Sequence, residues 1–159
     1  MNEQLVWVEN QALENIRFHI QSAEIISKEA NTTLTVFLAG IGGAAAYTVN
    51  LVDTHATIWL ISATIVFGIC LLILAGWIVC GCLRLRPIPS PTNEPVNLYQ
   101  PEFSLGSLRE AELKNLQTRI NDLVTRNAQV ADRLNRIRFC ALISPIIASV
   151  VALVVWVSR

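Results

Sequence analysis

Three arginines at heptad spacing are the residues of this chain best suited to do chemistry. Arg119, Arg126 and Arg133 recur every seven residues, so a helix presents them as one row. A guanidinium group is a planar fork of donors that matches phosphate and carboxylate oxygens. The row therefore has two interpretations. It is either a candidate site for a nucleotide or short oligonucleotide, or a solvated face beside anionic lipid headgroups.

No catalytic constellation accompanies this row. The two histidines, His19 and His55, lack the neighbours that a nucleophile–base pair needs. There is no phosphate-binding glycine loop and no His-Glu-x-x-His zinc sequence. The four cysteines lie within or at the ends of apolar runs, without the spacing of a zinc site or disulfide framework. We expect neither an enzyme nor a bound metal or cofactor.

The arginine row flanks a coiled-coil seam that runs from Leu113 to Ile137. Its a and d positions alternate spacings of three and four, and one of them is polar: Leu113, Leu116, Ile120, Leu123, Asn127, Val130, Leu134 and Ile137. An asparagine at an a position specifies register or oligomer state at a cost in stability. Asn127 is therefore predicted to set the register of an oligomer.

Three uncharged runs are long enough to cross a bilayer. They cover Thr32–Val52, Thr57–Leu83 and Phe139–Val157, and a spanning helix needs roughly 20 apolar residues. The whole chain is 53% hydrophobic and 15% charged, which is too apolar for an ordinary soluble domain. Spans without ionisable residues also argue against a proton-coupled pump or an ion exchanger.

The first span has a small-residue centre between Ala39 and Ala46. Pairs such as Ala39/Gly43 and Gly40/Ala44 are four residues apart, the arrangement that lets helix backbones approach closely. The candidate pore or close-packing residues are Ala39, Gly40, Gly42, Gly43 and Ala44. The partner is either another helix of the same chain or a second subunit. Hydroxyl residues are further candidates for a pore lining: Thr35, Ser62, Thr64, Ser144 and Ser149.

The basic residues predict the orientation of the spans. Eleven of the twelve Lys and Arg residues lie in residues 1–30 and 84–138, whereas the turn at 50–56 has none. Positive charge is retained on the cytoplasmic side. We therefore expect the amino terminus and the 84–138 segment to be cytoplasmic, and the carboxyl terminus to lie outside the bacterial inner (plasma) membrane.

These features predict an all-α membrane protein in four parts. Residues 1–31 form a cytoplasmic amphipathic helix, and 32–83 form a two-helix transmembrane hairpin. Residues 84–138 combine a proline-rich linker with the cytoplasmic coiled-coil helix, and 139–159 form the third transmembrane helix. The first helix and the seam helix both run from cytoplasm into membrane, so they can pack in parallel as a helical stalk. We expect the whole to be a homo-oligomer, because three spans cannot enclose a water-filled pore alone.

Local signals mark the ends of these parts. The first helix carries an apolar stripe of Leu13, Ile16, Ile20, Ala23 and Ala30. The linker contains Pro87, Pro89, Pro91, Pro95 and Pro101, which preclude a continuous helix. Ser107, three residues before Glu110, has the pattern of a capping box and predicts the start of the seam helix.

Two short segments complete a resemblance to a known group of proteins. Ser27-Lys28-Glu29-Ala30-Asn31 runs into the small-residue span, and Asn97-Leu98-Tyr99 precedes the long helix that leads into the third span. With these features the chain resembles, over nearly its whole length, the small transmembrane effectors of bacterial anti-phage systems. These include the Pycsar membrane effectors, the SLATT-type CBASS effectors and the Hailong membrane effector.

The resemblance implies a function. In such families a partner nucleotidyltransferase or cyclase makes a cyclic nucleotide or oligonucleotide, and the active effector breaches the inner membrane and stops growth. The leading hypothesis is thus an oligomeric antiviral defence effector that forms an ion-conducting or depolarising pore controlled by such a signal. Two alternatives stay open: a structural scaffold that binds a partner through its coiled coil, and a holin-like lysis protein.

Overall fold

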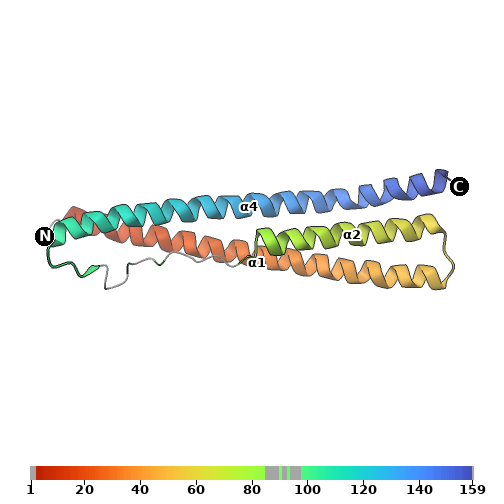
Figure 1. The fold of residues 1–159 in the computed structure, drawn as a ribbon, viewed down its shortest axis with the longest axis horizontal. Helices are drawn as coiled ribbons and strands as arrows, with labels where there is room; N and C mark the ends of the chain where they lie inside the picture. The colour runs from red at the N-terminus through yellow and green to blue at the C-terminus, as the bar shows by residue number, and fades with distance from the viewer. Residues whose placement is uncertain (1–2, 85–89, 91–92, 94–97, 159) are drawn as a thin grey trace. The chain divides into compact units, whose positions relative to one another are not determined.

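Three long helices make up the fold of the computed structural model, which describes residues 3–84, 90, 93 and 98–158. Helix α1 covers Glu3–Asp53, α2 covers Ile58–Gly81 and α4 covers Leu105–Val157 (Figure 1). The described residues include no strand. The prediction of an all-helical chain is confirmed. The amphipathic helix and the first span form one uninterrupted helix, as do the seam and the third span.

The chain divides into two compact units, and α1 and α4 contribute to both. Unit 1 comprises Met1–Ile26 with Leu85–Gln129, and unit 2 comprises Ser27–Arg84 with Val130–Arg159. Among the predicted linker prolines, Pro87, Pro89, Pro91 and Pro95 lie outside the described residues. So does Asn97 of the Asn97-Leu98-Tyr99 segment.

In unit 1, α1 and α4 lie side by side in parallel. Their core consists of Ile16 from α1 with Leu116, Ile120 and Leu123 from α4, all at most 4% exposed. Ala12, Leu13 and Ile20 pack around it. The apolar stripe of α1 and the a and d positions of α4 are therefore the buried faces, as the sequence predicts. The seam is filled by the chain's own first helix.

Helix α4 begins three residues earlier than the sequence predicts. Ser104 is the capping residue, because its Oγ accepts a hydrogen bond from the Ser107 backbone N–H at 3.2 Å. The Ser107 hydroxyl donates back to the Ser104 carbonyl at 2.8 Å. The capping-box prediction at Ser107 and Glu110 is therefore wrong in position. Ser104 and Ser107 both suit an N-cap. Ser104 takes this position because it lies where the chain leaves the turn at Pro101.

In unit 2, the remaining parts of α1 and α4 pack with α2 (Figure 1). The core joins Ala30 and Phe37 of α1 to Leu134 and Ile137 of α4 through four residues of α2: Leu71, Leu74, Ala75 and Ile78. Helix α2 runs antiparallel to both neighbours. Most of the exposed large apolar side chains of the described chain lie in this unit. All three helices are long and apolar enough to span a membrane, so the prediction of three spanning helices is confirmed at that level.

The turn between α1 and α2 closes with a Schellman motif. The Ala56 N–H donates to the Leu51 carbonyl at 2.9 Å, and the His55 N–H donates to the Val52 carbonyl at 3.1 Å. His55 has a φ of 54°, the left-handed conformation that this motif needs. The side chain is exposed. The backbone role of His55 supports its interpretation as a loop histidine rather than a metal or proton-relay group.

Helix α4 continues through Pro145 because a neighbouring hydroxyl replaces the missing donor. Proline has no N–H, so the carbonyl of Ala141, four residues earlier, loses its helical partner. The Ser144 hydroxyl donates to that carbonyl at 2.8 Å, and Ser144 is 1% exposed. In lipid such a carbonyl would find no water, so Ser144 makes Pro145 tolerable there.

Candidate functional site

The arginine row is shared between the two units. Arg119 and Arg126 lie in unit 1, and Arg133 lies in unit 2. Their surroundings differ, and each is described within its own unit.

Arg119 is already paired inside its own chain. Its Nη2 donates to Glu112 Oε1 at 3.0 Å, and its Nη1 donates to the Ser90 carbonyl at 3.1 Å. The two charged side chains are 15% and 25% exposed. Glu112 lies one heptad before Arg119, so it continues the row with the opposite charge. An anionic ligand at Arg119 would have to displace this carboxylate.

Arg126 is the arginine of the row in unit 1 that has a buried donor without a partner. Its Nη1 is buried and has no hydrogen-bond partner among the described residues. A buried guanidinium nitrogen without a partner is costly, because it loses hydration without replacement. Of the two arginines of the row that lie in unit 1, Arg126 is the one with capacity for an anion.

Arg133 borders a groove in unit 2. Its Nη1 donates to the Gly81 carbonyl at the end of α2, over a long 3.4 Å. No carboxylate pairs with it within the described part of the chain. Arg136, on the same side of α4, pairs with Asp132 at 2.7 Å.

Asn127 makes a contact inside unit 1. It is 9% exposed, and its Nδ2 donates to the His19 carbonyl of α1 at 2.8 Å. This bond fixes the register of α4 against α1, because a shift of either helix would break it. A role of Asn127 in the register of an oligomer stays a prediction.

The small residues of the first span divide between two faces of α1. Gly40 and Ala44 face α2: an ideal Cβ at Gly40 would lie 2.8 Å from Leu71 Cδ1, and Ala44 Cβ lies 3.5 Å from the Cβ position of Gly68. Ala39, Gly42 and Gly43 are exposed, and a Cβ at either glycine would meet nothing within 4 Å. Gly40 and Ala44 are therefore available for packing within the chain, and Ala39, Gly42 and Gly43 are available for contact with another helix.

The candidate lining hydroxyls mostly bond to their own helix. Thr35 donates to the Asn31 carbonyl, Thr64 to the Leu60 carbonyl and Ser149 to the Pro145 carbonyl, all at 2.8–3.0 Å. Their oxygens keep the ability to accept a hydrogen bond. Ser144 is buried beside Pro145 and is therefore not a surface residue of unit 2.

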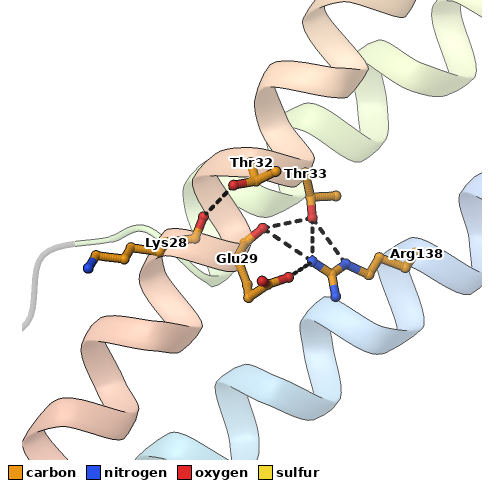
Figure 2. A network of polar contacts seen from close by, with 5 residues as sticks. All are labelled: Lys28, Glu29, Thr32, Thr33 and Arg138. Atoms are coloured by element: carbon orange, nitrogen blue, oxygen red, sulfur yellow. Dashed lines mark hydrogen bonds and ion pairs between the residues drawn. The ribbon is translucent and has the colours of Figure 1, made fainter.

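A polar network in unit 2 joins α1 to α4 where the predicted spans begin. Arg138 Nη2 donates to Glu29 Oε2 at 2.6 Å and to Thr33 Oγ1 at 2.8 Å, and its Nε donates to the same hydroxyl at 3.0 Å. Thr33 is 8% exposed and in turn donates to the Glu29 carbonyl at 2.8 Å. Figure 2 shows the guanidinium reaching Thr33 and Glu29, whereas Lys28 points away.

Sequence reasoning missed this network. The sequence patterns named Glu29 only within the segment Ser27-Lys28-Glu29-Ala30-Asn31 and did not pair it with Arg138. The available signal was one charge of each sign immediately before two spans whose helices were predicted to be parallel.

A second charged pair joins the same helices in unit 1. Arg109 donates from Nε to Glu9 Oε1 at 2.7 Å and from Nη2 to Glu9 Oε2, a two-pronged geometry. The bond from Arg109 lowers the pKa of Glu9 and outweighs the opposing effect of desolvation. The same bond raises the pKa of Arg109. Both groups are thereby held in their charged forms.

No group of three or more His, Cys, Asp or Glu side chains within the described ranges could hold a metal ion. The chain matches no protein-family model, no curated protein and no solved structure.

Proposed function

We propose that this protein is an oligomeric, non-enzymatic effector of the bacterial inner membrane that conducts ions or depolarises the membrane in response to an anionic signal. The observation that carries the proposal is the division of the glycine-rich segment of α1. Gly40 and Ala44 are used against α2, whereas Ala39, Gly42 and Gly43 stay exposed on an uncharged segment of α1. Helices in lipid associate where small residues let backbones approach.

The exposed face of α1 supports assembly through the spans. In unit 1 the seam is occupied by Ile16 and its neighbours from the same chain. We therefore assign the contact between copies to Ala39, Gly42 and Gly43. The distribution of Lys and Arg supports a cytoplasmic amino terminus and 84–138 segment.

Arg126 is the residue of the row that we assign to the signal, because Arg119 is paired with Glu112. The signal would be a nucleotide or oligonucleotide made by a nucleotidyltransferase or cyclase encoded beside this chain. Arg126→Ala should abolish the response to the signal, and Arg17→Ala, a change of an exposed arginine of α1, should not. An intact response in Arg126→Ala would move the signal site elsewhere.

The test of the pore is membrane potential in expressing bacteria, with and without the neighbouring genes. We expect depolarisation and growth arrest only when the signal is made. Gly42→Leu with Gly43→Leu should abolish both and reduce the native mass of the purified protein. Ala45→Leu is the matched control, because Ala45 is exposed in the same segment and borders a groove lined by Ile65 and Ile69 of α2.

The outcomes separate the alternatives. Absence of depolarisation and growth arrest under every condition would overturn the proposal. Lethality without any neighbouring gene would instead support a holin-like protein. A stable complex with another protein and no toxicity would support a scaffold.

A further inference from the structure

A groove in unit 2 combines two arginines with an apolar wall. It lies between the carboxyl end of α2 and α4, with a volume of about 370 Å³. Arg133, Arg136 and Gly81 line it together with Trp77, Ile137 and Cys140. The lining contains no carboxylate.

The positive charge of the groove is poorly neutralised. Among the residues that the structure describes, Arg133 donates to the Gly81 carbonyl, at 3.4 Å, and pairs with no carboxylate. Arg136 pairs with Asp132, but its side chain is 77% exposed, and exposed ion pairs on a helix are weak. Both guanidinium groups can therefore donate forked, charge-assisted hydrogen bonds to the oxygens of a phosphate.

The groove is polar at one end and apolar at the other. Helices α2 and α4 are antiparallel in unit 2, so Gly81 lies beside Arg133, whereas Trp77 lies toward Cys140. Arg133 precedes the third span and Cys140 lies within it. The polar end thus coincides with the start of the span, and the apolar end continues into it.

We propose that this groove binds one anionic phospholipid per chain. The phosphate lies between Arg133 and Arg136, and an acyl chain follows Trp77 and Cys140. Charge complementarity and the polar-to-apolar direction select this occupant, since basic pockets between helices on the cytoplasmic side bind anionic headgroups. This inference rests on the membrane placement in the proposed function, but not on the pore.

The experiment is native mass spectrometry of the full-length protein in detergent, titrated with dioleoyl phosphatidylglycerol or dioleoyl phosphatidylcholine. We expect one phosphatidylglycerol to be retained per chain, in preference to phosphatidylcholine. Arg133→Ala with Arg136→Ala should weaken its binding about tenfold or more, because each lost charge-assisted bond contributes strongly. Arg17→Ala with Lys114→Ala removes the same charge from exposed positions of unit 1 and should leave binding unchanged.

Two further arms make the result specific. Cys140→Trp fills the apolar end of the groove without changing its charge, so it should also weaken lipid binding. This variant tests the proposal if the double arginine variant does not fold. Glycerol 3-phosphate should fail to displace the lipid; displacement would show a phosphate site without a lipid chain. Equal binding of both lipids, or equal loss in both double variants, would overturn the proposal. Lipid binding without depolarisation would count against the pore alone.

Discussion

Units 1 and 2 join the same two helices, α1 and α4, by different means. In unit 1 a two-sided seam buries Ile16 against Leu116, Ile120 and Leu123, and charged groups lie at its flank. In unit 2 a third helix enters, and Gly40 and Ala44 bring it into close contact. Burial of large apolar side chains stabilises helices in water, whereas close backbone approach stabilises them in lipid. The surfaces differ as well: unit 2 carries most of the exposed large apolar side chains, whereas unit 1 has the Glu9–Arg109 pair beside its core.

The largest effect is expected from the core of unit 1. Leu123 is 1% exposed, so Leu123→Ala should leave a cavity and destabilise the helix pair by about 2–5 kcal/mol. Hydrogen exchange of the α4 amides around Leu123 measures this locally. Val124→Ala, at a position that is 42% exposed, should change protection little. Equal effects at both positions would show that the seam is not the core of this unit.

Close packing in unit 2 is tested by enlarging a glycine. A methyl at Gly40 can be absorbed by rotation of Leu71, but Gly40→Leu should overpack the contact and cost about 1–3 kcal/mol. Gly76→Leu is the control, because Gly76 is exposed on α2 and nothing lies within 4 Å of its Cβ position. Unfolding of the detergent-solubilised protein by dodecyl sulfate compares the two variants. A loss of stability in Gly76→Leu equal to that in Gly40→Leu would contradict the close packing of Gly40 against α2.

The polar link in unit 2 should have a smaller effect. Thr33→Val keeps the shape but removes the oxygen that accepts two bonds from Arg138, which should cost about 1 kcal/mol. Thr32→Val is a close control, because Thr32 is exposed and donates to the Lys28 carbonyl of its own helix, as Figure 2 shows. The same unfolding assay applies. If both changes are equally mild, the network does not hold α1 to α4.

The smallest effect is the pH dependence of the pair in unit 1. Arg109 lowers the pKa of Glu9, so the folded state favours the carboxylate. The stabilisation is therefore complete above the ordinary glutamate pKa of about 4.3 and is lost as the pH falls through the lowered value. Thermal unfolding followed by circular dichroism in this acidic range should show a small loss that Glu9→Gln removes. Glu14→Gln, a change of an exposed glutamate on α1, should retain it.

Much of the fold could be predicted from residue patterns. Uncharged runs of bilayer length indicated three spanning helices, and alternating spacings of three and four indicated which positions of α4 are buried. Leu116, Leu123, Leu134 and Ile137 are all at most 5% exposed. Periodicity is reliable here because it reports the angle of each side chain around its own helix axis.

The candidate site was less accessible to such reasoning. The heptad pattern placed the arginines in a row, but could not show that Glu112 pairs with Arg119 while Arg126 keeps a free donor. It also could not pair Arg138 with Glu29 and Thr33, which are over one hundred residues away in sequence. The partner of a long side chain depends on its distance from residues on neighbouring helices. The spacing of residues within one helix gives no information about those distances.

The sequence by itself determined the helices, the apolar spans and the buried face of each long helix, because these depend on local composition and on the helical repeat. Only the tertiary structure decided what covers each face. It placed Ile16 against the seam, turned Gly40 and Ala44 toward α2, and left Ala39, Gly42 and Gly43 exposed. A pattern of small or apolar residues predicts that a helix face is covered, but it does not identify the segment that covers it. That segment is determined by how the helices approach one another.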